Sequence, residues 1–215
     1  MIQLHYFPGN TSFAPHLLLE ELGTPFELQY VDRAVAAHKS PPYLKLNPNG
    51  LIPVLVDGDL VLYETAAICL HLADTHPEAG FAPAAGTAGR AHFYKWLMWM
   101  TNTLQSALIV YFYPERWVKE GNAAGAAEVK AKAEAKIGTL LDQMDAHLAS
   151  HGRDWFFGEC YSALDPYAFL MSRWTRGFGR PARSLPHLGP YLNRMLARPA
   201  VKRVFEKEEL PLPYV

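Results

Sequence analysis

The sequence predicts an α/β domain followed by an all-helical domain. Over residues 1–80, hydrophobic side chains recur with periods that alternate between about 2 and 3.6 residues, as in strands joined by helices. Residues 76–89 are rich in proline, glycine and alanine, a composition typical of linkers. Beyond them the strand pattern disappears. We therefore expect one domain over 1–77, a linker over 78–89 and a helical domain over 90–215.

The first domain begins with an expected strand near 2–7 and a helix over about 12–22. Gly23 ends this helix, because glycine readily takes the left-handed conformation of a C-terminal cap. A second strand is expected near 26–31. The stretch 34–50 contains three prolines, so it can hold a short helix at most.

Residues 53–63 predict a β-hairpin, because Asp57 and Gly58 form a typical turn signal. A helix is expected to follow over 64–74. The order is β-α-β and then β-β-α, so the first two strands should be parallel and the last two antiparallel. This arrangement is thioredoxin-like.

The helical domain shows four stretches of helical periodicity: 90–112, 123–150, 162–176 and 188–205. Within the first, residues 96–113 carry no charge and nominally reach transmembrane length. Polar side chains interrupt this window: Thr101, Asn102, Thr103, Gln105 and Ser106. We therefore expect a buried helix that lines a cleft or an interface, with no membrane contact.

Composition narrows the function classes. Half of the residues are hydrophobic (50%) and the net charge is -1, which is typical of a globular protein. Basic residues are interleaved with acidic ones and form no long run, so no nucleic-acid partner is expected. The chain opens without an export signal, and Cys69 and Cys160 fit buried free thiols, which together favour a cytoplasmic location.

Three small polar residues stand where the first strand gives way to the first helix: Asn10, Thr11 and Ser12. Such residues are preferred helix N-caps, and capping alone explains them. The start of a helix is also an anion site, where a hydroxyl can donate a hydrogen bond to a bound thiolate. These residues alone leave both interpretations open.

Two further features have a structural and a functional interpretation. Pro53 marks a strand edge, or a cis Ile52–Pro53 bond turns the Ile52 backbone toward a ligand. Glu64 and Thr65 begin a helix, where they either cap it or bind a ligand. As ligand groups, the helix N–H groups and the Thr65 hydroxyl would hold a carboxylate, while Glu64 would pair with an adjacent ammonium. Together they suit an α-amino-acid group.

Five segments, in this order, resemble the glutathione transferase superfamily and look most similar to its bacterial beta class. They are YFPGNTSFAPHLLLEELGTPFEL, NPNGLIPVL, YETAAICLHLAD, SALDPYAFLMSRW and YLNRMLARPAV. The resemblance covers essentially the whole chain. It implies the glutathione transferase architecture, glutathione as co-substrate with no tightly bound cofactor, a homodimer, and a role in detoxification.

The resemblance also implies which residues bind glutathione. Ile52, just before a cis Pro53, pairs through its backbone with the cysteinyl part. The pair Glu64–Thr65 holds the γ-glutamyl end. His38 or Lys39 reaches the glycyl carboxylate.

The chain departs from the beta class at the position of that class's cysteine, which can form a mixed disulfide with glutathione. The class pattern resembles PGACS, whereas this chain reads PGNTS, so Thr11 occupies the cysteine position. A mixed disulfide at this position is therefore impossible. The candidate thiolate donors are Thr11, Ser12 one residue further on, and Tyr6, which resembles the tyrosine of the alpha, mu and pi classes. Asn10 and the backbone complete the set.

The second domain is implied to bind the electrophile. In the long helix the beta class usually has His-Lys, where this chain has Gln105-Ser106. Phe112 and Trp174 resemble hydrophobic-site positions. Ser162 and Asp165 match the family's capping box, in which each side chain bonds the backbone N–H of the other residue.

No metal is expected. His147 and His151 have the spacing of a metal pair, but they lie in the last turn of a helix, where its dipole favours them, and they lack a third ligand. We expect a glutathione transferase that conjugates small apolar electrophiles. Two alternatives stay open: a glutathione-dependent disulfide or peroxide reductase, and a non-catalytic binding module of the same fold.

Overall fold

The computed structural model describes all 215 residues, which form two compact units. The first unit comprises Met1–Ala82 together with Met195–Leu212, and the second comprises Pro83–Arg194 together with Pro213–Val215. The first contains the only sheet, and the second is helical. The predicted fold class is confirmed. The segment Met195–Leu212, which the sequence assigns to the helical domain, groups with the sheet.

The sheet has the strand order β2-β1-β3-β4. Strand β1 (Ile2–Tyr6) is parallel to β2 (Phe26–Tyr30) and antiparallel to β3 (Val54–Asp57). Strand β3 pairs with β4 (Leu60–Tyr63) in the predicted hairpin. Its two-residue loop begins with Gly58, whose φ of 58° lies in the left-handed region that glycine adopts without strain.

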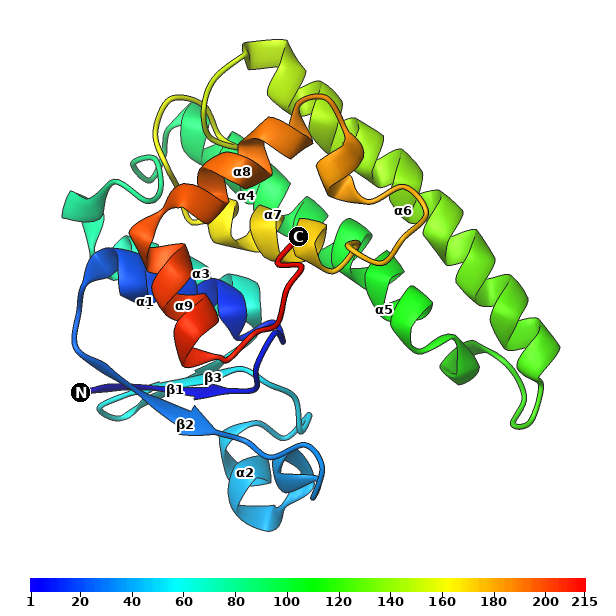
Figure 1. Cartoon of the computed structure of the whole chain (residues 1–215). Coiled ribbons are helices and arrows are strands. Elements are labelled where there is room, and N and C mark those ends of the chain that lie inside the picture. The colour runs from blue at the N-terminus through cyan, green and yellow to red at the C-terminus, as the bar shows by residue number, and fades with distance from the viewer. The chain divides into compact units, whose positions relative to one another are not determined.

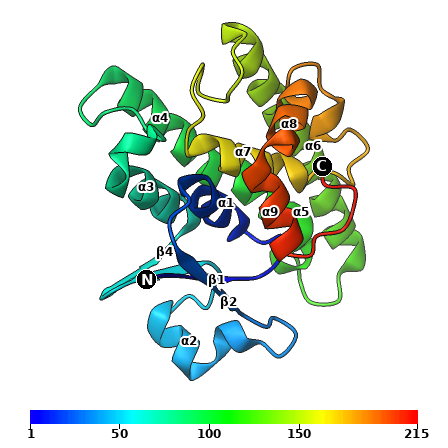
Figure 2. The same ribbon diagram turned by 60° about the vertical axis from the view of Figure 1, so that its left-hand side comes forward.

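Three helices cover the two faces of this sheet. Helices α1 (Phe13–Leu22) and α3 (Thr65–Thr75) lie on one face, and α2 (Pro41–Leu46) lies on the other (Figures 1 and 2). A short 3-10 turn, η1 (Ala37–Lys39), precedes α2, so the proline-rich stretch holds only short helices, as predicted. Helix α1 ends at Gly23 in the left-handed conformation.

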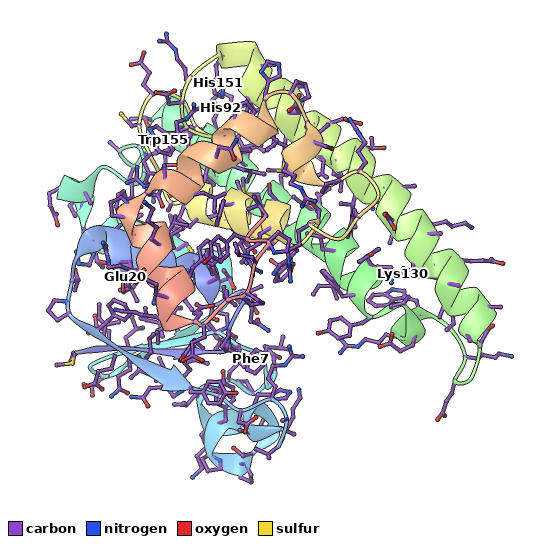
Figure 3. The ribbon with its side chains drawn as sticks, in the orientation of Figure 1. Phe7, Glu20, His92, Lys130, His151 and Trp155 are labelled. Atoms are coloured by element: carbon purple, nitrogen blue, oxygen red, sulfur yellow. The ribbon has the colours of Figure 1, made fainter.

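The last helix, α9 (Pro199–Lys207), belongs to the same unit as the sheet and runs beside α1 in both views (Figures 1 and 2). The rings of Phe13 and Phe205 pack with their centroids 5.5 Å apart. Glu20 of α1 meets two cations of α9: its carboxylate accepts hydrogen bonds from Arg203 and Lys207, both at 2.6 Å (Figure 3).

The single helix expected over 188–205 is wrong. The structure has α8 (Leu188–Ala197) and α9, separated at Arg198, whose ψ of 134° is extended. The cause is Pro199, because a proline ring clashes with a helical conformation of the preceding residue.

The helical unit contains α4 to α7 and most of α8. Helix α4 (Ala88–Trp99) continues through a π-helical segment, η3 (Met100–Gln105), into α5 (Ser106–Phe112). Helices α6 (Ala123–His151) and α7 (Leu164–Arg173) follow, as predicted. No helix combines the length and the hydrophobicity that crossing a bilayer requires. Three short 3-10 turns complete the chain: η2 (Pro77–Ala79), η4 (Pro114–Trp117) and η5 (Ala182–Ser184).

The predicted capping box at the start of α7 forms with one change. The buried carboxylate of Asp165 accepts the Ser162 N–H at 2.7 Å, as predicted, and also the Phe156 N–H at 2.8 Å. The Ser162 hydroxyl accepts the Leu164 N–H at 3.3 Å instead of the Asp165 N–H. The Asp165 N–H donates to the Ser162 carbonyl at 3.0 Å.

Candidate functional site

The loop between β1 and α1 places Thr11 against the loop before β3. The Thr11 hydroxyl lies 2.8 Å from the Ile52 carbonyl oxygen and 3.0 Å from Oδ1 of Asn10. Oδ1 of Asn10 also accepts the Thr11 N–H at 2.7 Å. Thr11 is 6% exposed, whereas Asn10 is partly exposed. The three residues therefore form one hydrogen-bonded cluster at Ile52.

The buried Ser12 side chain holds the loop between β1 and α1 through hydrogen bonds to the Phe7 backbone. Its side chain is fully buried, and its hydroxyl donates to the Phe7 carbonyl at 3.1 Å and accepts the Phe7 N–H at 3.3 Å. Ser12 precedes α1, yet its side chain caps no helical N–H. The capping interpretation of these small residues is thus not what the structure shows, because their side chains bond to the loop and to Ile52.

Tyr6 is the last residue of β1, and no hydrogen bond joins it to Asn10, Thr11 or Ile52. Its ring meets His16 of α1 at a centroid distance of 6.3 Å and Tyr30 at 6.0 Å. Burial raises the pKa of Tyr6, and the nearby Glu208 carboxylate adds to this effect. Tyr6 is therefore not part of the cluster at Ile52.

The Ile52–Pro53 bond is cis. The Ile52 C=O accepts the Thr11 hydroxyl, and the Ile52 N–H has no acceptor within the protein. Two donors hold the preceding Leu51 carbonyl, namely the Tyr43 hydroxyl and the Asn47 amide, each at 2.9 Å. The fixed loop leaves one backbone donor at Ile52 for a ligand.

Helix α3 begins without a side-chain cap. Thr65 is buried at its first position, and its hydroxyl has no hydrogen-bond partner within the protein. Glu64 precedes it, exposed and with a φ of 73°, an uncommon conformation for a residue with a side chain. The first N–H groups of a helix have no intrahelical acceptor, so this end is suited to bind an anion.

His38 and Lys39 lie in η1, beside the same loop. The Lys39 ammonium donates to the Asn49 carbonyl at 3.0 Å. Burial lowers the pKa of His38, and the charges of Lys39 and Arg33 lower it further. His38 Nδ1 is buried without a partner. The first unit thus brings the candidate residues of its three loops to one edge.

Three candidate residues lie in the helical unit. The rings of Phe112 and Trp174 meet edge to face, with their centroids 5.8 Å apart. Phe112 is 42% exposed. Gln105 lies at the end of η3, and its carbonyl oxygen accepts a hydrogen bond from the buried hydroxyl of Tyr167. The structure therefore joins Phe112 and Trp174 directly and holds Gln105 through Tyr167.

The comparisons with known proteins agree on one family. Residues 2–74 match the family model described as the N-terminal domain of glutathione S-transferase. A glutathione S-transferase of Xanthomonas campestris is 32% identical over 97% of this chain and 100% of its own length. The chain belongs to the glutathione transferase family.

Two solved structures of this family are similar to our transferase over nearly its whole length. A glutathione transferase homologue from Sulfitobacter, with bound glutathione, has a TM-score of 0.87 at 28% identity, over 98% of this chain and 99% of its own. A beta-class enzyme from Sphingomonas chungbukensis has a TM-score of 0.82 at 29% identity, over 97% and 100%.

This glutathione transferase carries no cysteine in the cluster at Ile52. Cys69 is buried in α3, where burial raises the pKa of its thiol, and Cys160 is exposed in the other unit. The rings of His147 and His151 meet edge to face with their centroids 4.9 Å apart, and no group of three or more His, Cys, Asp or Glu side chains is arranged to hold a metal.

Sequence reasoning missed one residue beside the site of this transferase, Glu208. Its fully buried carboxylate accepts the Gly9 N–H at 2.7 Å and bonds Nδ1 of the equally buried His16 at 2.8 Å. Glu208 follows α9, so it fixes the loop before Asn10 from the opposite end of the chain. Nothing local in the sequence signals a contact between residues so far apart.

Proposed function

We propose that this transferase conjugates the glutathione thiolate to small apolar electrophiles. The observation that carries the proposal is the uncapped start of α3. Its free N–H groups and the Thr65 hydroxyl suit the γ-glutamyl carboxylate, and the exposed Glu64 carboxylate suits the adjacent ammonium. Few ligands carry a carboxylate and an ammonium on the same carbon and continue from it as an extended peptide, as glutathione does.

The rest of glutathione follows from this anchor. The unpaired Ile52 N–H and its carbonyl would bind the cysteinyl residue, and His38 or Lys39 would bind the glycyl carboxylate. The sulfur then lies beside the cluster at Ile52. Of the expected thiolate donors, Thr11 is in that cluster, Ser12 is bonded to Phe7, and the Tyr6 ring packs on His16.

Catalysis would rest on thiolate activation and on proximity. A glutathione thiol gives its proton to solvent, and the thiolate forms the bond to the electrophilic carbon as the leaving group departs. We place the apolar part of the electrophile against Phe112 and Trp174, with Gln105 beside it. Since no cysteine lies in the cluster, no covalent bond between protein and glutathione is required.

The remaining expectations are proposed on the resemblance alone. They are a homodimer, a role in detoxification and action in the cytoplasm. Light scattering during gel filtration measures the oligomeric state directly, and a monomeric mass would refute the dimer without bearing on the chemistry.

The protein is expected to be retained on immobilised glutathione and to conjugate an aryl halide. Thr65→Val removes the free hydroxyl and should weaken glutathione binding about tenfold in calorimetry, the cost of one hydrogen bond to a charged group. Thr139→Val, an exposed position in α6, is the matched control and should bind as the wild type does.

Other outcomes would refute the proposal in distinct ways. Retention without any turnover indicates a non-catalytic binding module. Turnover of a disulfide or a peroxide but not of the aryl halide indicates a reductase. Absence of retention, with equal binding by both threonine variants, excludes the glutathione site at α3.

A further inference from the structure

We propose that the side-chain amide of Asn10, not a hydroxyl, donates the hydrogen bond that stabilises the glutathione thiolate. Thr11 then acts as a positioning residue that orients this amide. The inference rests on the proposed function, because it concerns the thiolate of the same bound glutathione. It follows from which hydrogen-bonding atoms of the loop are already paired and which are not.

The orientation of the Asn10 amide is fixed by its neighbour. A backbone N–H can only donate, so the Asn10 atom 2.7 Å from the Thr11 nitrogen is the carbonyl oxygen Oδ1. The Thr11 hydroxyl lies against the same oxygen at 3.0 Å. The amide nitrogen Nδ2 therefore points away from Thr11. It has no acceptor within the protein, and Asn10 is partly exposed.

The two hydroxyls beside it are committed elsewhere. Thr11 has one hydroxyl proton, and both oxygens within reach of it, Ile52 C=O at 2.8 Å and Asn10 Oδ1, accept it. Donation to a ligand would break this buried bond. The Ser12 hydroxyl is fully buried and satisfied by the Phe7 backbone. A donor that is already unpaired loses nothing by binding the thiolate.

Tyr6 has an unpaired hydroxyl but no bond to the cluster at Ile52. Its ring packs on His16 and Tyr30, with centroids 6.3 and 6.0 Å away. The Glu208 carboxylate also acts on Tyr6.

The cluster places the free amide where the sulfur is expected. The Thr11 hydroxyl links Asn10 to the Ile52 carbonyl, and the Ile52 backbone is the proposed partner of the cysteinyl residue. An amide donates without losing its proton, so the thiol proton passes to solvent and the thiolate accepts Nδ2–H. Because this bond favours the charged form, it lowers the pKa of the thiol.

The test is the ultraviolet titration of the thiol in bound glutathione. Asn10→Ala removes the donor without adding a charge and should raise the pKa of the thiol by about one unit, the value of one hydrogen bond to an anion. Thr11→Val removes the hydroxyl but keeps the N–H that orients Asn10, so its shift should be smaller. Asn102→Ala, at an exposed position in η3, is the matched control.

A second ligand separates activation from binding. S-Methylglutathione has no ionisable thiol, so Asn10→Ala should bind it within about threefold of the wild type. A shift of the thiol pKa in Thr11→Val that equals or exceeds the shift in Asn10→Ala overturns the inference while the proposed function stands. Failure of the wild type to bind glutathione refutes the proposed function itself.

Discussion

At the scale of single residues, Glu64 shows how the candidate site depends on backbone conformation. Its φ of 73° is adopted readily by glycine but rarely by residues with a side chain. A strained residue persists where the surrounding structure holds it, and such residues concentrate at binding sites. Glu64 gives the first turn of α3 its free N–H groups and places a carboxylate beside them.

Glu64→Gly should therefore separate stability from binding. Relief of the strained conformation is expected to keep the free energy of unfolding level or raise it by up to about 1 kcal/mol. Loss of the carboxylate should weaken glutathione binding about tenfold. Urea denaturation and calorimetry measure the two effects.

The control is Glu128→Gly, at an exposed position within α6. There glycine costs about 1 kcal/mol of stability relative to a good helix former and should leave binding unchanged. Equal losses of stability in the two variants would show that Glu64 is not strained.

Ser12, Asn10 and Thr11 also show the limit of sequence reasoning at this scale. The sequence identified all three as a cap or a thiolate cradle, because small polar residues at the start of a helix serve both purposes. Their roles diverge only through bonds to Phe7 and Ile52. Such bonds depend on side-chain orientation, which residue type alone does not determine.

At the scale of elements, the end of α6 contains a histidine whose charge the fold disfavours. Nε2 of His147 bonds the Phe156 carbonyl at 2.8 Å, and the ring packs at a tilt against Trp96 with a centroid distance of 4.3 Å. The pKa of His147 is lowered to about 4, chiefly by burial; the charges of His151 and Lys95 contribute, and the bond to the Phe156 carbonyl opposes them. The histidine pair is thus part of the packing of this unit.

The sign of the pH effect follows from this lowered pKa. The unfolded chain binds a proton at His147 near pH 6.5, whereas the folded chain does so only near about pH 4. The stability that His147 contributes is therefore full above pH 6.5 and is lost as the pH falls toward 4. His147→Gln keeps a donor for the Phe156 carbonyl and should lose less stability over this range.

Urea denaturation at a series of pH values measures the difference between variant and wild type. The exposed His92, on α4, offers the control His92→Gln, which should retain the pH dependence of the wild type (Figure 3). The interpretation fails if His147→Gln and His92→Gln lose stability in parallel.

At the scale of the whole molecule, the two ends of the chain meet in the first unit. Glu208, just after α9, binds Gly9 and His16, and Arg198, just before α9, pairs with Glu21 through two hydrogen bonds. The loop that carries Asn10 is thus held in place by the C-terminal segment Met195–Leu212.

Glu208→Gln should destabilise the protein by about 2–4 kcal/mol. An amide has one acceptor oxygen and no charge, so either the buried Gly9 N–H loses its acceptor or His16 loses the carboxylate oxygen beside its Nδ1. Glu206→Gln, an exposed position on α9, is the control and should stay within about 0.5 kcal/mol of the wild type. Urea denaturation measures the free energy of unfolding of both variants, and equal values for the two would contradict the role of Glu208.

Local signals account for what the sequence predicted of the whole fold. Periodicity and the Asp57-Gly58 turn predicted the hairpin, the strand directions and most helices, since each depends on neighbouring residues. The break at Arg198 was also readable, from Pro199, but helical periodicity on both sides concealed it. The position of α9 beside α1 was not readable, because it depends on residues almost the whole chain apart.

The π-helical segment η3 bears on how the chain tolerates insertions and deletions. A π turn holds about one residue more than an α turn, so it acts as a single insertion absorbed inside a continuous helix. Deleting one residue between Met100 and Gln105 should therefore regularise the helix and leave the later side chains facing as they do now, so Phe112 should keep its contact with Trp174. In a regular α-helical turn, where each residue advances about 100° around the axis, the same deletion would rotate Phe112 away from Trp174.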